Sequence, residues 1–145
     1  HYAVVFNFPD GVIVDFSSTQ YTKGYDDICC RVYGGAGTAD THYFGAVSID
    51  GDKPYKGGNH PNLYTDGAVS NIKEFHRMIT AGDFSNPTVE PSVRSNLTCV
   101  LGRMATRARR EVTWDEMMNS ELKLGPKVFE MGPVDVPKTI PVPGE

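Results

Sequence analysis

The chain has 145 residues, of which 39% are apolar, and its 18 acidic and 14 basic residues give a net charge of −4. A chain of this length can build one domain with a hydrophobic core, and its mildly acidic balance offers no broad surface for nucleic acid. Because no apolar run approaches the roughly 20 residues of a membrane helix, we expect neither nucleic acid nor membrane among its partners.

The cysteines Cys29, Cys30 and Cys99 are odd in number and include no C-x-x-C pair. This pattern argues against a disulfide framework and against a zinc knuckle, so we expect no bound metal. Buried, inert thiols are the expected state, and they suit a reducing compartment such as the cytoplasm. The location of the parent protein stays open, because the strand-like start at His1 indicates a piece of a longer protein.

The first part of the chain is predicted to form strands. Alternating apolar residues predict a strand over Tyr2–Phe8. Pro9-Asp10-Gly11 then predicts a hairpin turn into a second strand over Val12–Ser18. A third strand is expected over Ile28–Tyr33, and one or two more over Thr41–Ile49. The short connections favour antiparallel pairing.

The second part of the chain is predicted to be helical. Apolar residues recur at helical spacing over Asp66–Ala81, with Thr65 or Asp66 as the cap and Gly82 as the end. A second helix is expected over Pro91–Ala108, because proline is favoured in a first helical turn.

A short third helix is predicted where Thr113–Glu116 forms a capping box, and Trp114 beside the cap is expected to be packed. The helical pattern fades from about Glu121, and prolines become frequent. Proline at that density disfavours helix and sheet interior. We therefore expect a folded domain over residues 1–120 and an extended, proline-rich tail over 121–145.

Strands followed by helices predict an α+β fold, with helices packed on one face of an open, mostly antiparallel sheet. Apolar residues also occur on the other predicted face, which includes Cys29 and Tyr33. Since large apolar surfaces are rarely left in water, we expect something outside this chain to cover that face.

A glycine-rich segment, Gly35–Asp40, follows a predicted strand as a dinucleotide-binding turn does. However, Asp40 replaces the third glycine, and a strand follows where the phosphate site needs a helix N-terminus. We favour a turn between strands and expect this chain to bind no cofactor. Asp40 and His42 can share one strand face, but two potential ligands do not make a metal site.

A polar segment, Lys56–Tyr64, gathers amine, amide, imidazole and phenol groups in the predicted loop before the first helix. Loops carry ligand contacts more often than cores do. The candidate substrate-binding residues are His60, Asn62 and Tyr64. The alternative is a polar connection in which Tyr64 packs on the helix, and the sequence leaves both open.

Four segments of the helical part occur in a familiar order: Gly67–Phe75, Val89–Ser95, Leu101–Ala105 and Val112–Glu116. Together they resemble the C-terminal domain of the glucose–fructose oxidoreductase, inositol dehydrogenase and MocA family. In the strand part, Asp10-Gly11 and Val32–Thr38 also fit, so that the resemblance covers roughly residues 1–120.

The resemblance implies a two-domain enzyme in which a Rossmann domain binds NAD or NADP. The domain seen here would line the substrate pocket and make subunit contacts. We therefore expect part of an NAD(P)-dependent oxidoreductase acting on a sugar or polyol, without the Rossmann domain and inactive alone. The expected partners are that missing domain, a second copy bound through the sheet, and a sugar-like small molecule.

No catalytic residue can be assigned from the resemblance. The family's catalytic lysine lies between Glu and Pro in the nucleotide-binding domain, whereas Asp52-Lys53-Pro54 falls in a predicted turn. The family's Asp-x-x-x-His pair has no counterpart near the start of this chain. Two alternatives stay open: a domain of an NAD-dependent glycosidase of the same family, and a non-catalytic binding or oligomerisation module.

Overall fold

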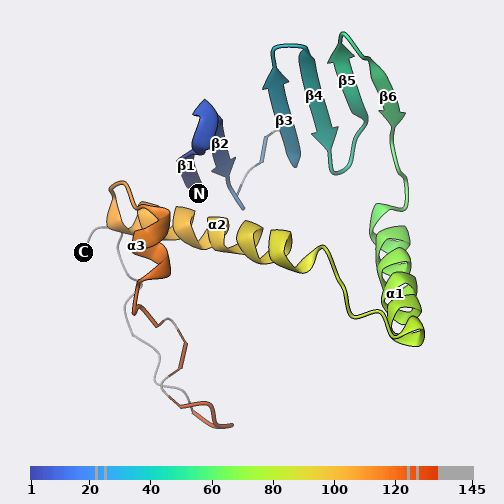
Figure 1. The fold of residues 1–145 in the computed structure, drawn as a ribbon. Helices are drawn as coiled ribbons and strands as arrows, with labels where there is room; N and C mark the ends of the chain where they lie inside the picture. Colours follow the sequence, from blue (N-terminus) through green and yellow to red (C-terminus); the bar gives the residue numbers. More distant parts are fainter. Residues whose placement is uncertain (22, 25, 124, 127, 134–145) are drawn as a thin grey trace. The chain divides into compact units, whose positions relative to one another are not determined.

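The computed structural model describes residues 1–21, 23–24, 26–123, 125–126 and 128–133 (Figure 1). The chain divides into two compact units, one formed by His1–Gln20 with Pro87–Glu145 and the other by Tyr21–Asn86. Among the described residues, none of the helices is both long and apolar enough to cross a membrane. The elements in chain order are β1 (Tyr2–Asn7), a 3-10 turn (Pro9–Gly11), β2 (Ile13–Ser18), β3 (Cys29–Gly34), β4 (Gly37–His42), β5 (Val47–Gly51), β6 (Tyr55–Gly58), α1 (Leu63–Ala81), α2 (Val89–Ala108) and α3 (Trp114–Met118).

The first unit begins with the predicted hairpin. β1 and β2 pair antiparallel, and the Phe8 N–H donates to the Val12 carbonyl over a distance of 2.8 Å. Asp10 and Gly11 adopt left-handed backbone angles, with φ of 61° and 73°. Aspartate and glycine tolerate this conformation, which explains why the chain reverses at this point.

Helix α2 packs against the hairpin at Gly102, which is buried. A Cβ atom at this position would lie 2.7 Å from Cζ of Phe6 and 3.7 Å from Cγ1 of Val4. The helix backbone therefore rests directly on the face of β1 that carries these side chains. In this unit a helix does pack on one sheet face, as expected.

Helix α3 packs on α2, and two buried apolar side chains lie here in the first unit: Met117 within α3 and Val112 just before its cap. The predicted cap is confirmed, because the Glu116 N–H donates to Oγ1 of Thr113 over 3.2 Å. Trp114 is only half-buried, so its ring is a boundary group rather than the centre of the core.

The second unit contains a four-stranded antiparallel meander in the order β3-β4-β5-β6 (Figure 1). Two of its features differ from the sequence prediction. β4 begins at Gly37, earlier than Thr41, and β6 occupies part of the polar segment expected to be a loop. Asp52-Lys53-Pro54 lies between β5 and β6, as the predicted turn requires.

Glycine explains why these strands were hard to predict. A Cβ atom on Gly37 would lie 2.4 Å from the carbonyl oxygen of Asp50, so only glycine allows β4 and β5 to approach here. In β6, a register shift leaves Gly57 at a bulge opposite Val47 and Ser48. Glycine is depleted in strands, and a propensity argument therefore assigns these residues to turns.

The helix boundaries largely follow their predicted signals. Gly82 ends α1 in a left-handed conformation with φ of 65°, and its N–H contacts the carbonyls of Met78 and Ile79. At the other end, the prediction of a cap at Thr65 or Asp66 was wrong: α1 begins at Leu63, after Asn62. Helix α2 begins at Val89, which places Pro91 in its first turn as predicted.

The α+β class with antiparallel sheets is confirmed, but the strands belong to two sheets instead of one. Alternation gives the four-stranded sheet one polar face, on which Cys29, Arg31, Tyr33, Thr38, Asp40, His42, Ser48 and Asp50 lie. The opposite face, called here the apolar face, carries Cys30, Val32, Ala39, Val47, Ile49 and Tyr55 together with one hydroxyl residue, Thr41.

Two expectations about exposure were wrong. The face of Cys29 and Tyr33 is not the apolar one, because Arg31 and Asp40 form an ion pair between them. The thiols of Cys29, Cys30 and Cys99 are exposed instead of buried. On the apolar face, Val32 is 59% exposed and Tyr55 is 57% exposed.

The expected tail over residues 121–145 is only partly described. Residues 121–123, 125–126 and 128–133 contain bends and no helix or strand. The other tail residues lie outside the described part of the chain.

Candidate functional site

Five side chains meet on the polar face where β3 and β4 pair. Cys29 lies directly opposite His42, and Arg31 lies opposite Asp40. Alternate residues of a strand point to the same face, so these four share one side of the sheet. Asp27, which precedes Cys29 by one intervening residue, completes the group. We call these residues the β3–β4 cluster.

His42 lies between two carboxylates. Its Nδ1 is 2.8 Å from Oδ2 of Asp27, and its Nε2 is 3.0 Å from Oδ1 of Asp40. The second carboxylate oxygen of Asp40 accepts a hydrogen bond of 2.9 Å from Nε of Arg31. The side chains of Asp27, His42 and Asp40 are 15%, 23% and 30% exposed, so the cluster is partly shielded from water.

The two contacts of His42 are not equivalent. The hydrogen bond with Asp27, together with the charges of both carboxylates, raises the pKa of His42. Asp40 Oδ1 is buried, and among the described residues it has no well-aligned hydrogen-bond donor, although Nε2 of His42 is close. The Asp27 contact is therefore the stronger one. On the other side, the hydrogen bond from Arg31 lowers the pKa of Asp40.

This arrangement gives the imidazole two chemical options. It can hold a proton on each nitrogen, as a cation between two carboxylates. Alternatively, Asp40 can orient the ring through Nε2 while Nδ1 serves another ligand.

An aromatic group lies in the same unit. Tyr43 and Phe44 belong to the turn between β4 and β5, and Tyr64 lies in the first turn of α1. The ring of Tyr43 packs edge-on against Phe44 and Tyr64, with centroid distances of 5.1 and 5.2 Å. A hydrogen bond with the Tyr64 hydroxyl raises the pKa of Tyr43. This contact connects α1 to the turn that follows His42.

The three predicted substrate-binding residues engage different partners. Nε2 of His60 lies 2.9 Å from Oδ2 of Asp66, and both side chains are more than half exposed. Asn62 precedes α1, where its carbonyl accepts the Asp66 N–H and its side chain makes no cap. Tyr64 instead joins the aromatic group, packing against a turn rather than only along its own helix.

The sequence reasoning placed Asp40 and His42 on one face but did not include Asp27, Cys29 or Arg31. The period-two spacing of Asp27, Cys29 and Arg31 was the available signal. It could not be joined to Asp40 and His42, because the register between the two strands is a property of the folded sheet.

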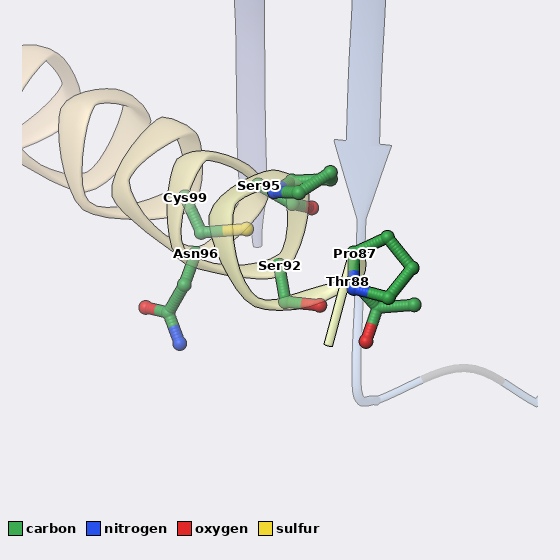
Figure 2. Close-up of a pocket in the computed structure, with 7 residues that line it drawn as sticks. Pro87, Thr88, Ser92, Ser95, Asn96 and Cys99 are labelled. Atoms are coloured by element: carbon green, nitrogen blue, oxygen red, sulfur yellow. The ribbon is translucent and has the colours of Figure 1, made fainter. Parts of the chain in front are cut away.

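A shallow depression of about 590 Å³ lies at the start of α2 in the first unit (Figure 2). It is lined by Pro87, Thr88, Pro91, Ser92, Ser95, Asn96 and Cys99. Hydroxyl, amide and thiol groups line it without carboxylates, imidazoles or amines, so it lacks the acid–base groups of the β3–β4 cluster.

No protein-family model, curated protein or solved structure matches this chain. The resemblance of its helical segments to the oxidoreductase family therefore stays a prediction, and so do the activity and cofactors that it implies.

Proposed function

We propose that this chain is the substrate-pocket and assembly domain of an NAD(P)-dependent oxidoreductase acting on a sugar or polyol. One observation carries the proposal: the four-stranded sheet has a polar face with ionisable residues and an exposed apolar face. A polar face suits a hydroxylated substrate, whereas exposed apolar patches mark sites of protein contact. The apolar face then binds either a nucleotide-binding domain or a second copy.

The substrate class follows from the aromatic group and from the residues that precede α1. Tyr43 and Tyr64 combine an apolar ring with a hydroxyl, which suits the C–H and O–H groups of a sugar. His60 and Asn62 add exposed polar groups at the start of α1. In this proposal these residues bind and orient the substrate.

The nicotinamide cofactor would be held elsewhere. Residues Gly35–Asp40 do not fit its pyrophosphate, because β4 begins at Gly37 and no helix N-terminus follows the turn. A nicotinamide accepts or donates hydride at a substrate carbon. The chain's own residues contribute the pocket wall, and no catalytic step is assigned to them.

Ligand-observed saturation-transfer NMR with a panel of monosaccharides and polyols tests the substrate class. We expect transfer to at least one of these compounds, and its loss in Tyr64→Ala. Tyr55→Ala is the matched control, because Tyr55 is similarly exposed, at 57% against 63% for Tyr64, but lies in β6 and not in the aromatic group. No transfer to any compound, or equal loss in both variants, would contradict the proposal.

A second measurement separates an enzyme from a binding module. The longer protein that contains this domain should reduce NAD or NADP in the presence of the compound that the domain binds. Sugar binding without nicotinamide reduction would favour the non-catalytic module instead.

A further inference from the structure

We propose that Asp27, Cys29 and His42 form a zinc-binding site. Their ligand atoms, a carboxylate oxygen, Sγ and an imidazole nitrogen, all lie within 4.8 Å of one another. The sequence alone predicted no metal because it could place only two potential ligands together. The pairing of Cys29 with His42 across β3 and β4 brings Asp27 to them as the third.

The three donor groups of this site favour zinc over magnesium and calcium. Thiolate, imidazole and carboxylate are the ligands of Zn²⁺, whereas Mg²⁺ and Ca²⁺ prefer sites made of oxygen alone. Zinc bonds of about 2.0–2.3 Å require the donor atoms to approach within about 3–4 Å of one another. Because Cys29 is exposed, its side chain has the freedom for this small closure.

Asp40 is the positioning residue of the site. Its Oδ1 lies 3.0 Å from Nε2 of His42, and Arg31 holds its other oxygen. Carboxylates commonly fix a metal-binding histidine through the ring nitrogen that does not touch the metal, and a small ring rotation on zinc binding would align Nε2 of His42 with Oδ1 of Asp40. Nδ1 of His42 is thereby left to face Asp27, where the metal would lie.

Zinc would replace the proton that Nδ1 of His42 shares with Asp27 and the proton of the Cys29 thiol, and both protons would leave to solvent. Three protein ligands leave a fourth position for water or for an oxygen of a bound molecule, as in open zinc sites. The exposed thiol places this position at the surface. The site depends on the β3–β4 pairing and not on the proposed oxidoreductase function.

Calorimetric titration of the chain with Zn²⁺ alone tests the inference. We expect one Zn²⁺ per chain with micromolar or tighter affinity and release of protons to the buffer. Titration with Co²⁺ identifies the thiolate, because a sulfur ligand gives an intense charge-transfer absorption. Absence of Zn²⁺ binding at micromolar concentration would overturn the proposal.

Neighbouring variants identify the ligands. Cys29→Ser should abolish the Co²⁺–sulfur absorption, whereas Cys30→Ser should retain it, since Cys30 is also exposed but lies on the opposite face. Asp40→Asn should weaken Zn²⁺ binding about 10–100-fold while the sulfur absorption persists at saturation. An absorption that survives in Cys29→Ser or disappears in Cys30→Ser would refute the assignment. Circular dichroism of each variant establishes that it is folded.

Discussion

Replacing Gly102 by alanine tests the contact between α2 and the β1–β2 hairpin. Alanine is favoured over glycine within a helix by about 1 kcal/mol. Against this gain, the new Cβ would lie 2.7 Å from Cζ and 3.3 Å from Cε1 of Phe6. Overpacking of this kind costs about 1–3 kcal/mol. We therefore expect Gly102→Ala to lower the free energy of unfolding by about 1 kcal/mol.

Gly67→Ala in α1 is the matched control, because a Cβ atom there would meet nothing within 4 Å. We expect this variant to be more stable than the original chain by about 0.5–1 kcal/mol. Urea unfolding followed by circular dichroism measures both changes. Phe6→Leu replaces the ring by a shorter side chain and should relieve the clash. The loss of unfolding free energy in the double variant should therefore be smaller than the sum of the losses in the two single variants. If Gly102→Ala stabilises the chain as much as Gly67→Ala does, the proposed contact is wrong.

Four further outcomes are expected. Thr113→Ala removes the cap of α3 and should lower the free energy of unfolding in urea by about 1 kcal/mol, whereas Thr113→Ser keeps a hydroxyl and should lower it much less. Equal stability of the original chain and both variants would contradict the cap. The hydrogen bond from Arg110 lowers the pKa of Glu116. The ionised Glu116 therefore stabilises the fold above the ordinary glutamate pKa, and this stabilisation is lost as the pH falls through the lowered pKa. Glu116→Gln should accordingly melt at a lower temperature than the original chain at neutral pH, and at the same temperature in acid. Calorimetric titration of this chain with NAD and NADP should give no heat of binding, and saturable micromolar binding would disprove the expectation that this chain binds no nicotinamide cofactor. Light scattering should detect a defined dimer or tetramer. Val32→Asp on the apolar face should disrupt this assembly, whereas Tyr33→Asp on the polar face should not. A monomer at tens of micromolar would exclude assembly through this sheet.

The sequence by itself determined the features that depend on neighbouring residues. The turn at Pro9–Gly11, the end of α1 at Gly82 and the cap of α3 at Thr113 all form as predicted. Each rests on a backbone conformation or a hydrogen bond within a few residues, so the amino-acid types suffice to predict it.

Tertiary structure decided the strands that contain glycine and the composition of the site. Gly37 and Gly57 lie in strands because a facing strand approaches them closely. The strand preferences of these residues and their sequence neighbours do not predict that approach. Alternation alone placed Asp40 with His42, but Cys29 and Asp27 join them only through the register of β3 against β4. Register is fixed by contacts between residues distant in the sequence, and a shift by one residue would turn Cys29 to the opposite face.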